Sequence, residues 1–159
     1  MSELKRTQLY DVHVAAGATM VDFGGWEMPI KYPTDIVAEH LYTRHFCSLF
    51  DVSHMGRILV DGPEAVPFLQ HVLSSNVLAL DVNQAQYAII PNESGGAVDD
   101  AYLYRFEADR YLLVVNAANT DKDLAHLEEQ IKAFDARMTV ITADVAAIAV
   151  QGPKAKELL

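Results

Sequence analysis

Apolar positions recur with a helical period in three stretches of the chain. In residues 35–46, DIVAEHLYTRHF, they lie near every 3.6 residues, which predicts a helix with Asp35 at its acidic start. Residues 61–73, DGPEAVPFLQHVL, predict a second helix. Pro63 suits a first turn there, whereas Pro67 either bends the helix or moves its start to a later residue.

The third predicted helix opens at Thr120. Thr120 and Asp123 form a capping-box pattern, in which side chains satisfy free backbone N–H groups at a helix start. The residues that follow give one apolar face, which we expect to pack on the core. That face consists of Leu124, Leu127, Ile131 and Phe134.

Short runs of β-branched and aromatic residues predict the strands. In the first 34 residues the glycines and prolines predict irregular structure instead. From residue 57 to residue 142 the predicted order is β-α-β-β-β-α-β, which indicates an α+β fold, a mostly antiparallel sheet with flanking helices. The predicted strands cover residues 57–60, 86–90, 97–106, 110–116 and 138–142.

The C-terminal segment, VAAIAVQGPKAKELL, predicts a strand, a Gly-Pro turn and the beginning of a helix. Natural domains seldom end so soon after a helix begins. We therefore expect a truncated chain, in which the first 50 or so residues and this tail belong to one incomplete domain.

Composition narrows the classes of function. The 159 residues are 51% hydrophobic and 21% charged, which is ordinary for a globular protein. No apolar run reaches the roughly 20 residues that span a bilayer, and the N-terminus lacks the apolar stretch of a signal peptide. With Cys47 as its single cysteine the chain forms no internal disulfide, so we expect a cytoplasmic protein without membrane attachment.

The net charge of −10 disfavours nucleic-acid binding, because the field of the protein repels phosphate. An anionic small molecule would need basic groups placed locally, and the chain has few.

The stretch GGAVDDAYLYR contains the clearest candidate chemistry. Asp is depleted in strands, yet two adjacent carboxylates stand in a predicted one. Side chains alternate along a strand, so Asp100, Tyr102 and Tyr104 share one face. A carboxylate beside aromatic rings suits a flat, nitrogen-rich ligand. The alternative is a solvated strand end in which Asp99 pairs with Arg105.

Other candidates have weaker patterns. Ser53 and His54 are adjacent in sequence and lack a third orienting residue, so a Ser-His hydrolase is disfavoured. His45 and Cys47 do not have the paired spacing of metal ligands, and we expect no metal. Asn116, at the end of an apolar strand, either caps a turn or orients a ligand.

Five segments occur in an order that resembles one family. They are MVDFGGWEMPIKY, AEHL…LFDVSHMGRI, QAQYAI…NESGGAVDDAYLYR, YLLVVNAAN…KD and IAVQGP. Together they resemble the aminomethyltransferases (T-proteins) of the glycine cleavage system, in their N-terminal portion. The resemblance implies a transferase of glycine catabolism and one-carbon metabolism, with three domains in a clover leaf around a folate site.

The resemblance also implies a reaction and a domain organisation. Such enzymes take the aminomethyl group from the lipoyl arm of the H-protein, release ammonia and form methylenetetrahydrofolate from tetrahydrofolate. Residues 1–51 would be the first part of domain one, 52–145 an α+β second domain and 146–159 the return into domain one.

Family roles carry over where residues match. Asp100, the second member of the pair, corresponds to the catalytic aspartate. Folate-contacting positions correspond to Met55, Tyr87, Tyr102, Tyr104 and Asn116. A glutamate that reads the pterin, and arginines for the H-protein and the folate tail, lie downstream of these residues in the family.

Two alternatives stay open at this point. One is a folate-binding relative of the same fold, linked to tRNA modification or similar to sarcosine and dimethylglycine dehydrogenases. The other is an inactive truncated fragment, whose uncovered apolar surface would favour self-association.

Overall fold

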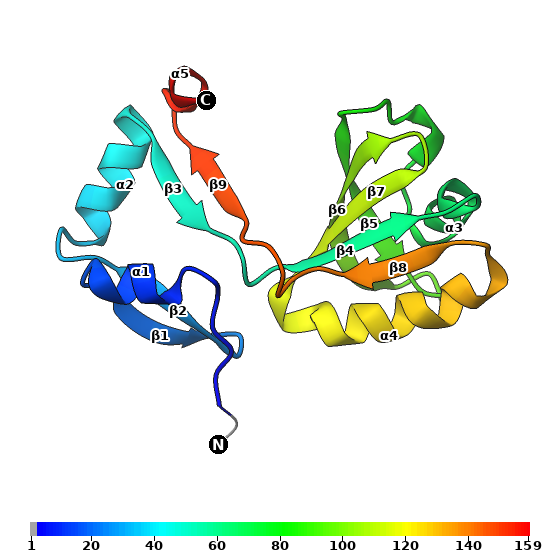
Figure 1. Ribbon diagram of the computed structural model, residues 1–159, viewed down its shortest axis with the longest axis horizontal. Coiled ribbons are helices and arrows are strands. Elements are labelled where there is room, and N and C mark those ends of the chain that lie inside the picture. Colours follow the sequence, from blue (N-terminus) through cyan, green and yellow to red (C-terminus); the bar gives the residue numbers. More distant parts are fainter. Residues whose placement is uncertain (1–2) are drawn as a thin grey trace. The chain divides into compact units, whose positions relative to one another are not determined.

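The computed structural model describes residues 3–159, and the chain divides into two compact units. The first unit runs to His54 and resumes at Ala143–Leu159, and the second unit is Met55–Thr142. Figure 1 shows the elements of both units.

The second unit is built on a five-stranded sheet with the order β5-β6-β7-β4-β8, in which every neighbouring pair is antiparallel. The element order from β4 to β8 is β-α-β-β-β-α-β apart from short 3-10 turns, so the predicted α+β fold is confirmed. The strands are β4 (Gly56–Asp61), β5 (Ala85–Pro91), β6 (Ala97–Glu107), β7 (Arg110–Val115) and β8 (Arg137–Val140).

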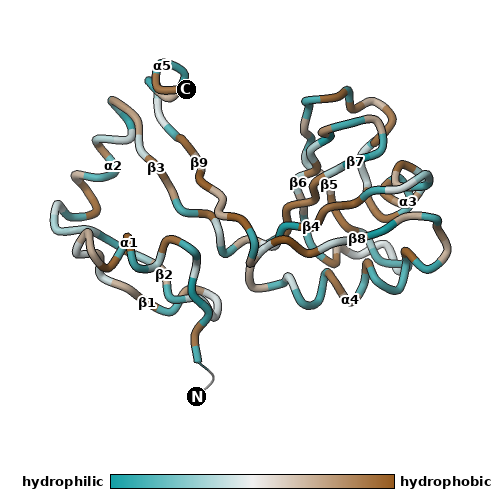
Figure 2. Tube along the Cα trace, in the orientation of Figure 1, coloured by the Kyte–Doolittle hydropathy of each residue, from teal (hydrophilic) through white to brown (hydrophobic). Residues whose placement is uncertain are grey.

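Two helices, α3 (Ala65–Val72) and α4 (Thr120–Gln130), cover one face of this sheet. Side chains of both helices join alternate strand residues in a single buried cluster. In Figure 2, α4 alternates between hydrophobic and hydrophilic turns, the pattern of a helix with one apolar face. The cluster includes Ile58, Phe68, Leu103, Leu113 and Leu127, none of which has measurable exposure.

The predicted helices lie where the sequence places them, and the second one takes the later start that Pro67 left open. The second predicted helix begins at Ala65 rather than near residue 61, so Pro67 lies in its first turn, where a missing N–H costs no intrahelical bond. The prediction of a capping box at Thr120 was wrong. Thr120 is the first helical residue, its Oγ1 donates to the Asn116 carbonyl at 3.0 Å, and the Asp123 side chain is buried.

Short 3-10 helices complete the second unit. They are η1 (Val77–Ala79), η2 (Ala117–Asn119) and η3 (Ile131–Ala133). The η2 turn explains the failed capping box, because the chain is already wound before Thr120 and the cap position falls on Asn119.

The first unit corrects the prediction that the first 34 residues are irregular. They contain a short helix, α1 (Tyr10–Ala15), and a hairpin of β1 (Thr19–Phe23) and β2 (Trp26–Lys31). Gly24 and Gly25 have φ of 60° and 86°, which is the geometry of a two-residue hairpin turn. The glycines that indicated irregular chain therefore form a tight turn.

The other elements of the first unit follow the sequence pattern more closely. The predicted helix 35–46 is α2 (Ile36–His45), and the Asp35 carboxylate accepts the Ala38 N–H at 2.9 Å. Strand β3 (Ser48–Asp51), which was not predicted, pairs with β9 (Ile148–Gln151), and α5 (Ala155–Leu158) follows. Among residues 3–159, no helix combines the length and the hydropathy needed to cross a membrane.

Candidate functional site

Strand β6 directs its two adjacent aspartates to opposite faces of the sheet. Ala101 and Leu103 are buried in the core, on the side covered by helices, and Asp99 shares that parity. Asp100 and Tyr104 are exposed on the other face, with Tyr102 between them half-buried. The predicted division of the strand into two faces is confirmed.

Asn116, directly after the end of β7, makes hydrogen bonds to both aspartates of the neighbouring strand β6. It follows β7, whose Val115 pairs with Ala101, so its amide lies beside both carboxylates. Its Nδ2 donates to Asp99 Oδ1 and to Asp100 Oδ1, each at 3.0 Å. An amide nitrogen carries two hydrogens, so one side chain orients both carboxylates.

The Asp100 face carries a row of three tyrosine rings. Tyr87 pairs with Tyr102 across β5 and β6, and their rings meet edge to face with centroids 5.1 Å apart. Tyr102 and Tyr104 meet in the same way at 5.1 Å. Tyr87 is 68% exposed, while partial burial raises the pKa of Tyr104. The row gives a broad aromatic wall beside a fixed carboxylate.

Met55 lies at the same end of the sheet as Asn116. Gly56 pairs with Val115 in antiparallel strands, so Met55, which precedes Gly56, and Asn116, which follows Val115, are neighbours. A Cβ on Gly56 would lie 2.5 Å from Val115 Cγ2 and 2.7 Å from Thr120 Oγ1. The absence of a side chain there lets the start of α4 approach β4 closely. No pattern in the sequence indicated a role for this glycine.

Asp123, which the sequence pattern placed in a capping box, makes a different contribution. It is fully buried on α4, and its carboxyl group interacts with that of Asp99. Burial is the main reason that the pKa of Asp123 rises to about 7, and the hydrogen bond to Asp99 and its charge add to the effect. In the sequence, Asp123 stood out only as the last residue of the segment YLLVVNAAN…KD and as part of the capping-box pattern.

Asp99 shows the opposite balance. Burial opposes its ionisation, yet hydrogen bonds from Asn116 and from the Asp123 carboxyl outweigh burial and hold the pKa of Asp99 below its ordinary value. The predicted alternative pairing with Arg105 is wrong. That guanidinium donates instead to three backbone carbonyls, those of Leu80, Glu107 and Ala108.

The arrangement provides a negative charge with fixed orientation on an open, aromatic surface. Such a surface can stack on a flat ring system, and the carboxylate can accept an N–H or stabilise a positive charge near it. The five residues predicted together with Asp100 all lie in the second unit. Asn116 is at hydrogen-bonding distance from Asp100, and Tyr102 and Tyr104 share its face of β6, where their rings form one row with Tyr87.

The Ser53 and His54 pair has no nucleophile geometry. Ser53 is buried, where its Oγ accepts the Ala147 N–H at 2.9 Å, and the His54 ring packs edge-on against Phe23. His45 Nδ1 lies 2.7 Å from the Leu41 carbonyl of its own helix. Within the described residues no group of three or more His, Cys, Asp or Glu side chains could hold a metal ion.

A buried polar network in the first unit was not predicted. His13 Nε2 lies 2.9 Å from Asp51 Oδ2, and Thr7 donates to the same oxygen at 2.7 Å. Burial opposes ionisation of Asp51, but hydrogen bonds from Ser53, His13 and Thr7 lower its pKa overall. The network connects α1 to β3 and is consistent with a structural role.

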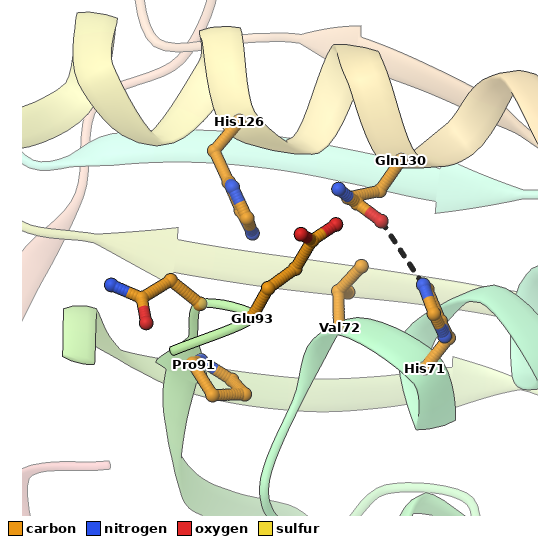
Figure 3. A pocket seen from close by; sticks show the side chains of 7 residues that line it. His71, Val72, Pro91, Glu93, His126 and Gln130 are labelled. Atoms are coloured by element: carbon orange, nitrogen blue, oxygen red, sulfur yellow. Dashed lines mark hydrogen bonds between the residues drawn. The ribbon is translucent and has the colours of Figure 1, made fainter. Parts of the chain in front are cut away.

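A hollow in the second unit lies away from the predicted residues (Figure 3). It forms between α3, α4 and the turn after β5, with His71 and Gln130 hydrogen-bonded at 3.0 Å on one side, His126 on the other and the Glu93 side chain between them. Its volume of about 150 Å³ is below the 300–1,000 Å³ of ordinary small-molecule sites. The candidate site is therefore the open face and not this hollow.

Comparisons with known proteins agree on one relationship. A family model described as "GCVT N-terminal domain" matches residues 9–159. An aminomethyltransferase of Thermus thermophilus is 50% identical over 156 residues, covering 98% of this chain and 44% of that protein. One of Desulfitobacterium hafniense is 45% identical over 159 residues, covering 100% of this chain and 43% of that protein.

A solved structure gives the same result. The crystal structure of the glycine cleavage system aminomethyltransferase T from Bartonella henselae matches with a TM-score of 0.89 at 39% identity. The match covers 98% of this chain and 43% of the other. The chain thus spans less than half the length of the relatives that it matches.

Proposed function

The chain belongs to the aminomethyltransferase family of the glycine cleavage system, and from that premise we propose that it supplies the catalytic carboxylate of such a transferase. In this proposal the complete protein takes the aminomethyl group from the lipoyl arm of an H-protein. It transfers the carbon to tetrahydrofolate and releases ammonia. Methylenetetrahydrofolate is the product.

One observation carries the proposal. Asp100 projects from β6 onto an open face, its Oδ1 is held at 3.0 Å by the Asn116 amide, and a row of tyrosine rings continues from it along the strand. Such a row offers aromatic rings against which a pterin can stack beside a carboxylate. A carboxylate already oriented before the ligand arrives needs no reorganisation during the reaction.

The proposed roles follow from the chemistry of the transfer. Positive charge develops on the aminomethyl carbon as ammonia leaves. The Asp100 carboxylate stabilises that charge and orients the attacking folate amine. Asn116 orients Asp100, and the tyrosines and Met55 contact the folate ring. Asp100 is not a nucleophile in this scheme.

We also propose the domain assignment that the resemblance implies. Residues 1–51 and 146–159 belong to domain one, and residues 52–145 form the second domain. The division of the chain into compact units, with the second unit at Met55–Thr142, lies within three residues of these boundaries and supports the proposal.

The test is a transfer assay with the complete protein. Tetrahydrofolate and an H-protein loaded with the aminomethyl group are the substrates, and methylenetetrahydrofolate and ammonia are measured together. Formation of both in equal amounts is the expected result. Folate binding without transfer would identify instead a folate-binding relative of the same fold.

Tyr104 provides a prediction about binding. We expect Tyr104→Ala to weaken tetrahydrofolate binding by about 1 kcal/mol, roughly fivefold, through loss of ring stacking. It should leave the melting temperature nearly unchanged, because the ring is 38% exposed and faces away from the core. Isothermal titration and thermal melts on the same variant measure the two effects. Tyr111→Phe, which keeps a buried ring on the core side, is the matched control.

The isolated chain provides a second prediction. We expect residues 1–159 alone to bind tetrahydrofolate weakly, with a dissociation constant above about 100 μM, and to give no turnover. The reason is geometric, since a ligand on this face touches one wall while small-molecule sites bury roughly 70–90% of the ligand surface. Titration and the transfer assay on the purified chain measure both. Micromolar binding with turnover would contradict the expectation.

A further inference from the structure

Three buried carboxyl oxygens on the core side of β6 lack a hydrogen-bond partner among the described residues. Asp123 has no exposed surface, and neither of its oxygens has a donor among the described residues. Asp99 Oδ2 is also buried and without a donor. A buried ionised carboxylate without donors is very unfavourable, and two adjacent carboxylates do not both ionise easily.

A single proton resolves this conflict. The interaction of the two carboxyl groups becomes a hydrogen bond when one of them is protonated. Asp99 already accepts an N–H from Asn116 through Oδ1, whereas Asp123 receives no other hydrogen bond from the described residues. The proton therefore resides on Asp123, which donates to Asp99 Oδ2.

The surrounding charges agree with this placement. Strand β6 presents Asp99 and Asp100, and both negative charges favour the neutral form of Asp123. Lys122 on α4 favours the ionised form, but its ammonium group donates to the Val98 carbonyl at 2.6 Å and the residue is solvent-exposed. The Asn119 side chain, before α4, also favours the ionised form of Asp99 and so lowers its pKa.

We propose that Asp123, as a neutral carboxylic acid, is a positioning residue for Asp100, acting through Asp99 and Asn116. The Asp123 hydroxyl donates to Asp99 Oδ2, the ionised Asp99 holds one hydrogen of the Asn116 amide, and the other hydrogen holds Asp100 Oδ1. The relay connects the core side of the sheet to its open face. It rests on the proposed function, since it gives Asp100 the orientation that the transfer requires.

Two substitutions of Asp123 separate this role from plain packing. Asp123→Asn keeps an N–H donor toward Asp99, so kcat in the complete protein should stay within about threefold of the unaltered value. Asp123→Ala removes the donor, and kcat should fall by roughly 10- to 100-fold while KM for tetrahydrofolate changes little, as expected for misorientation of a catalytic group.

The pH dependence gives a readout that needs no activity. With a pKa of about 7 in the folded protein and about 4 unfolded, Asp123 binds more protons when folded between those values. Its stabilising contribution is thus complete below about pH 4 and is lost as pH rises through 7. The melting temperature of the unaltered protein, taken relative to Asp123→Asn, should fall between pH 5 and 8.

Each outcome decides a separate point. Equal kcat for Asp123→Ala and the unaltered protein, or equal losses for Asn and Ala, would overturn the proposal. A melting-temperature difference that is constant between pH 5 and 8 would also overturn it. If Asp123→Ala does not fold, carboxyl NMR decides: the Asp100 signal of the unaltered protein should shift as Asp123 titrates near pH 7. If the unaltered protein does not transfer the aminomethyl group, the proposed function is wrong. The hydrogen-bond relay from Asp123 to Asp100 is still tested by the NMR titration.

Discussion

An Asp100→Asn substitution in the complete protein is expected to slow aminomethyl transfer by a factor of about 10²–10³, the usual loss for one preorganised electrostatic group. Asparagine keeps the shape of the side chain and removes the charge that stabilises the developing cation. Because Asp100 is exposed to solvent, the substitution should leave the fold intact. Steady-state kinetics with tetrahydrofolate and loaded H-protein, beside a thermal melt, measure both effects.

Asp99→Asn is the matched control, because it makes the same chemical change one residue away on the opposite face. The carbonyl of the new amide can still accept from Asn116, and its NH₂ can donate to Asp123, which then ionises in its place. We expect a loss below about tenfold, since only an indirect contact to the reacting atoms changes. Near-normal turnover of Asp100→Asn, or a larger loss for Asp99→Asn, would show that the wrong carboxylate was assigned.

A Gly56→Ala substitution is expected to lower the free energy of unfolding by about 2 kcal/mol, in the range of overpacked cores. The new methyl group would overlap Val115 Cγ2 at 2.5 Å and both γ atoms of Thr120 within 2.9 Å. Relief requires Val115 at the end of β7 and Thr120 at the start of α4 to move, and Asn116 is displaced with them because it lies between these two residues in the chain. Folate affinity should therefore fall together with the melting temperature.

Gly96→Ala is the control for the loss of glycine itself. Neither glycine has a positive φ, so neither substitution introduces left-handed backbone strain. The nearest atom to a Cβ at position 96 is Nδ2 of the exposed Asn92 side chain, at 3.2 Å, so that side chain needs to shift by only a few tenths of an ångström. Its Oδ1 accepts from Ser94 and from the Gly96 N–H, and so small a shift leaves these hydrogen bonds in place. We expect a change below about 0.5 kcal/mol. Equal losses from the two variants in chemical denaturation would mean that close packing at Gly56 is not the cause.

The faces of β6 could be predicted because alternation is a local property of an extended chain. The period of two is enough to place Asp100, Tyr102 and Tyr104 on one face, and the order of strands and helices followed from apolar periodicity in the same way. The hairpin of β1 and β2 was not predicted, because it depends on two consecutive residues with positive φ, Gly24 and Gly25. Composition alone does not distinguish such a turn from irregular chain.

The sequence by itself determined the α+β order, the family and the Asp100 face, because each depends on short-range patterns or on residues adjacent in the chain. Only the tertiary structure decided what Asn116, Gly56 and Asp123 do. Asn116 holds two carboxylates because β7 lies beside β6, and Gly56 is needed because α4 approaches β4. Asp123 fits a capping pattern in sequence, yet burial against Asp99 raises its pKa to about 7. Contacts between distant segments, and the cost of burying charge where they meet, have no local signature.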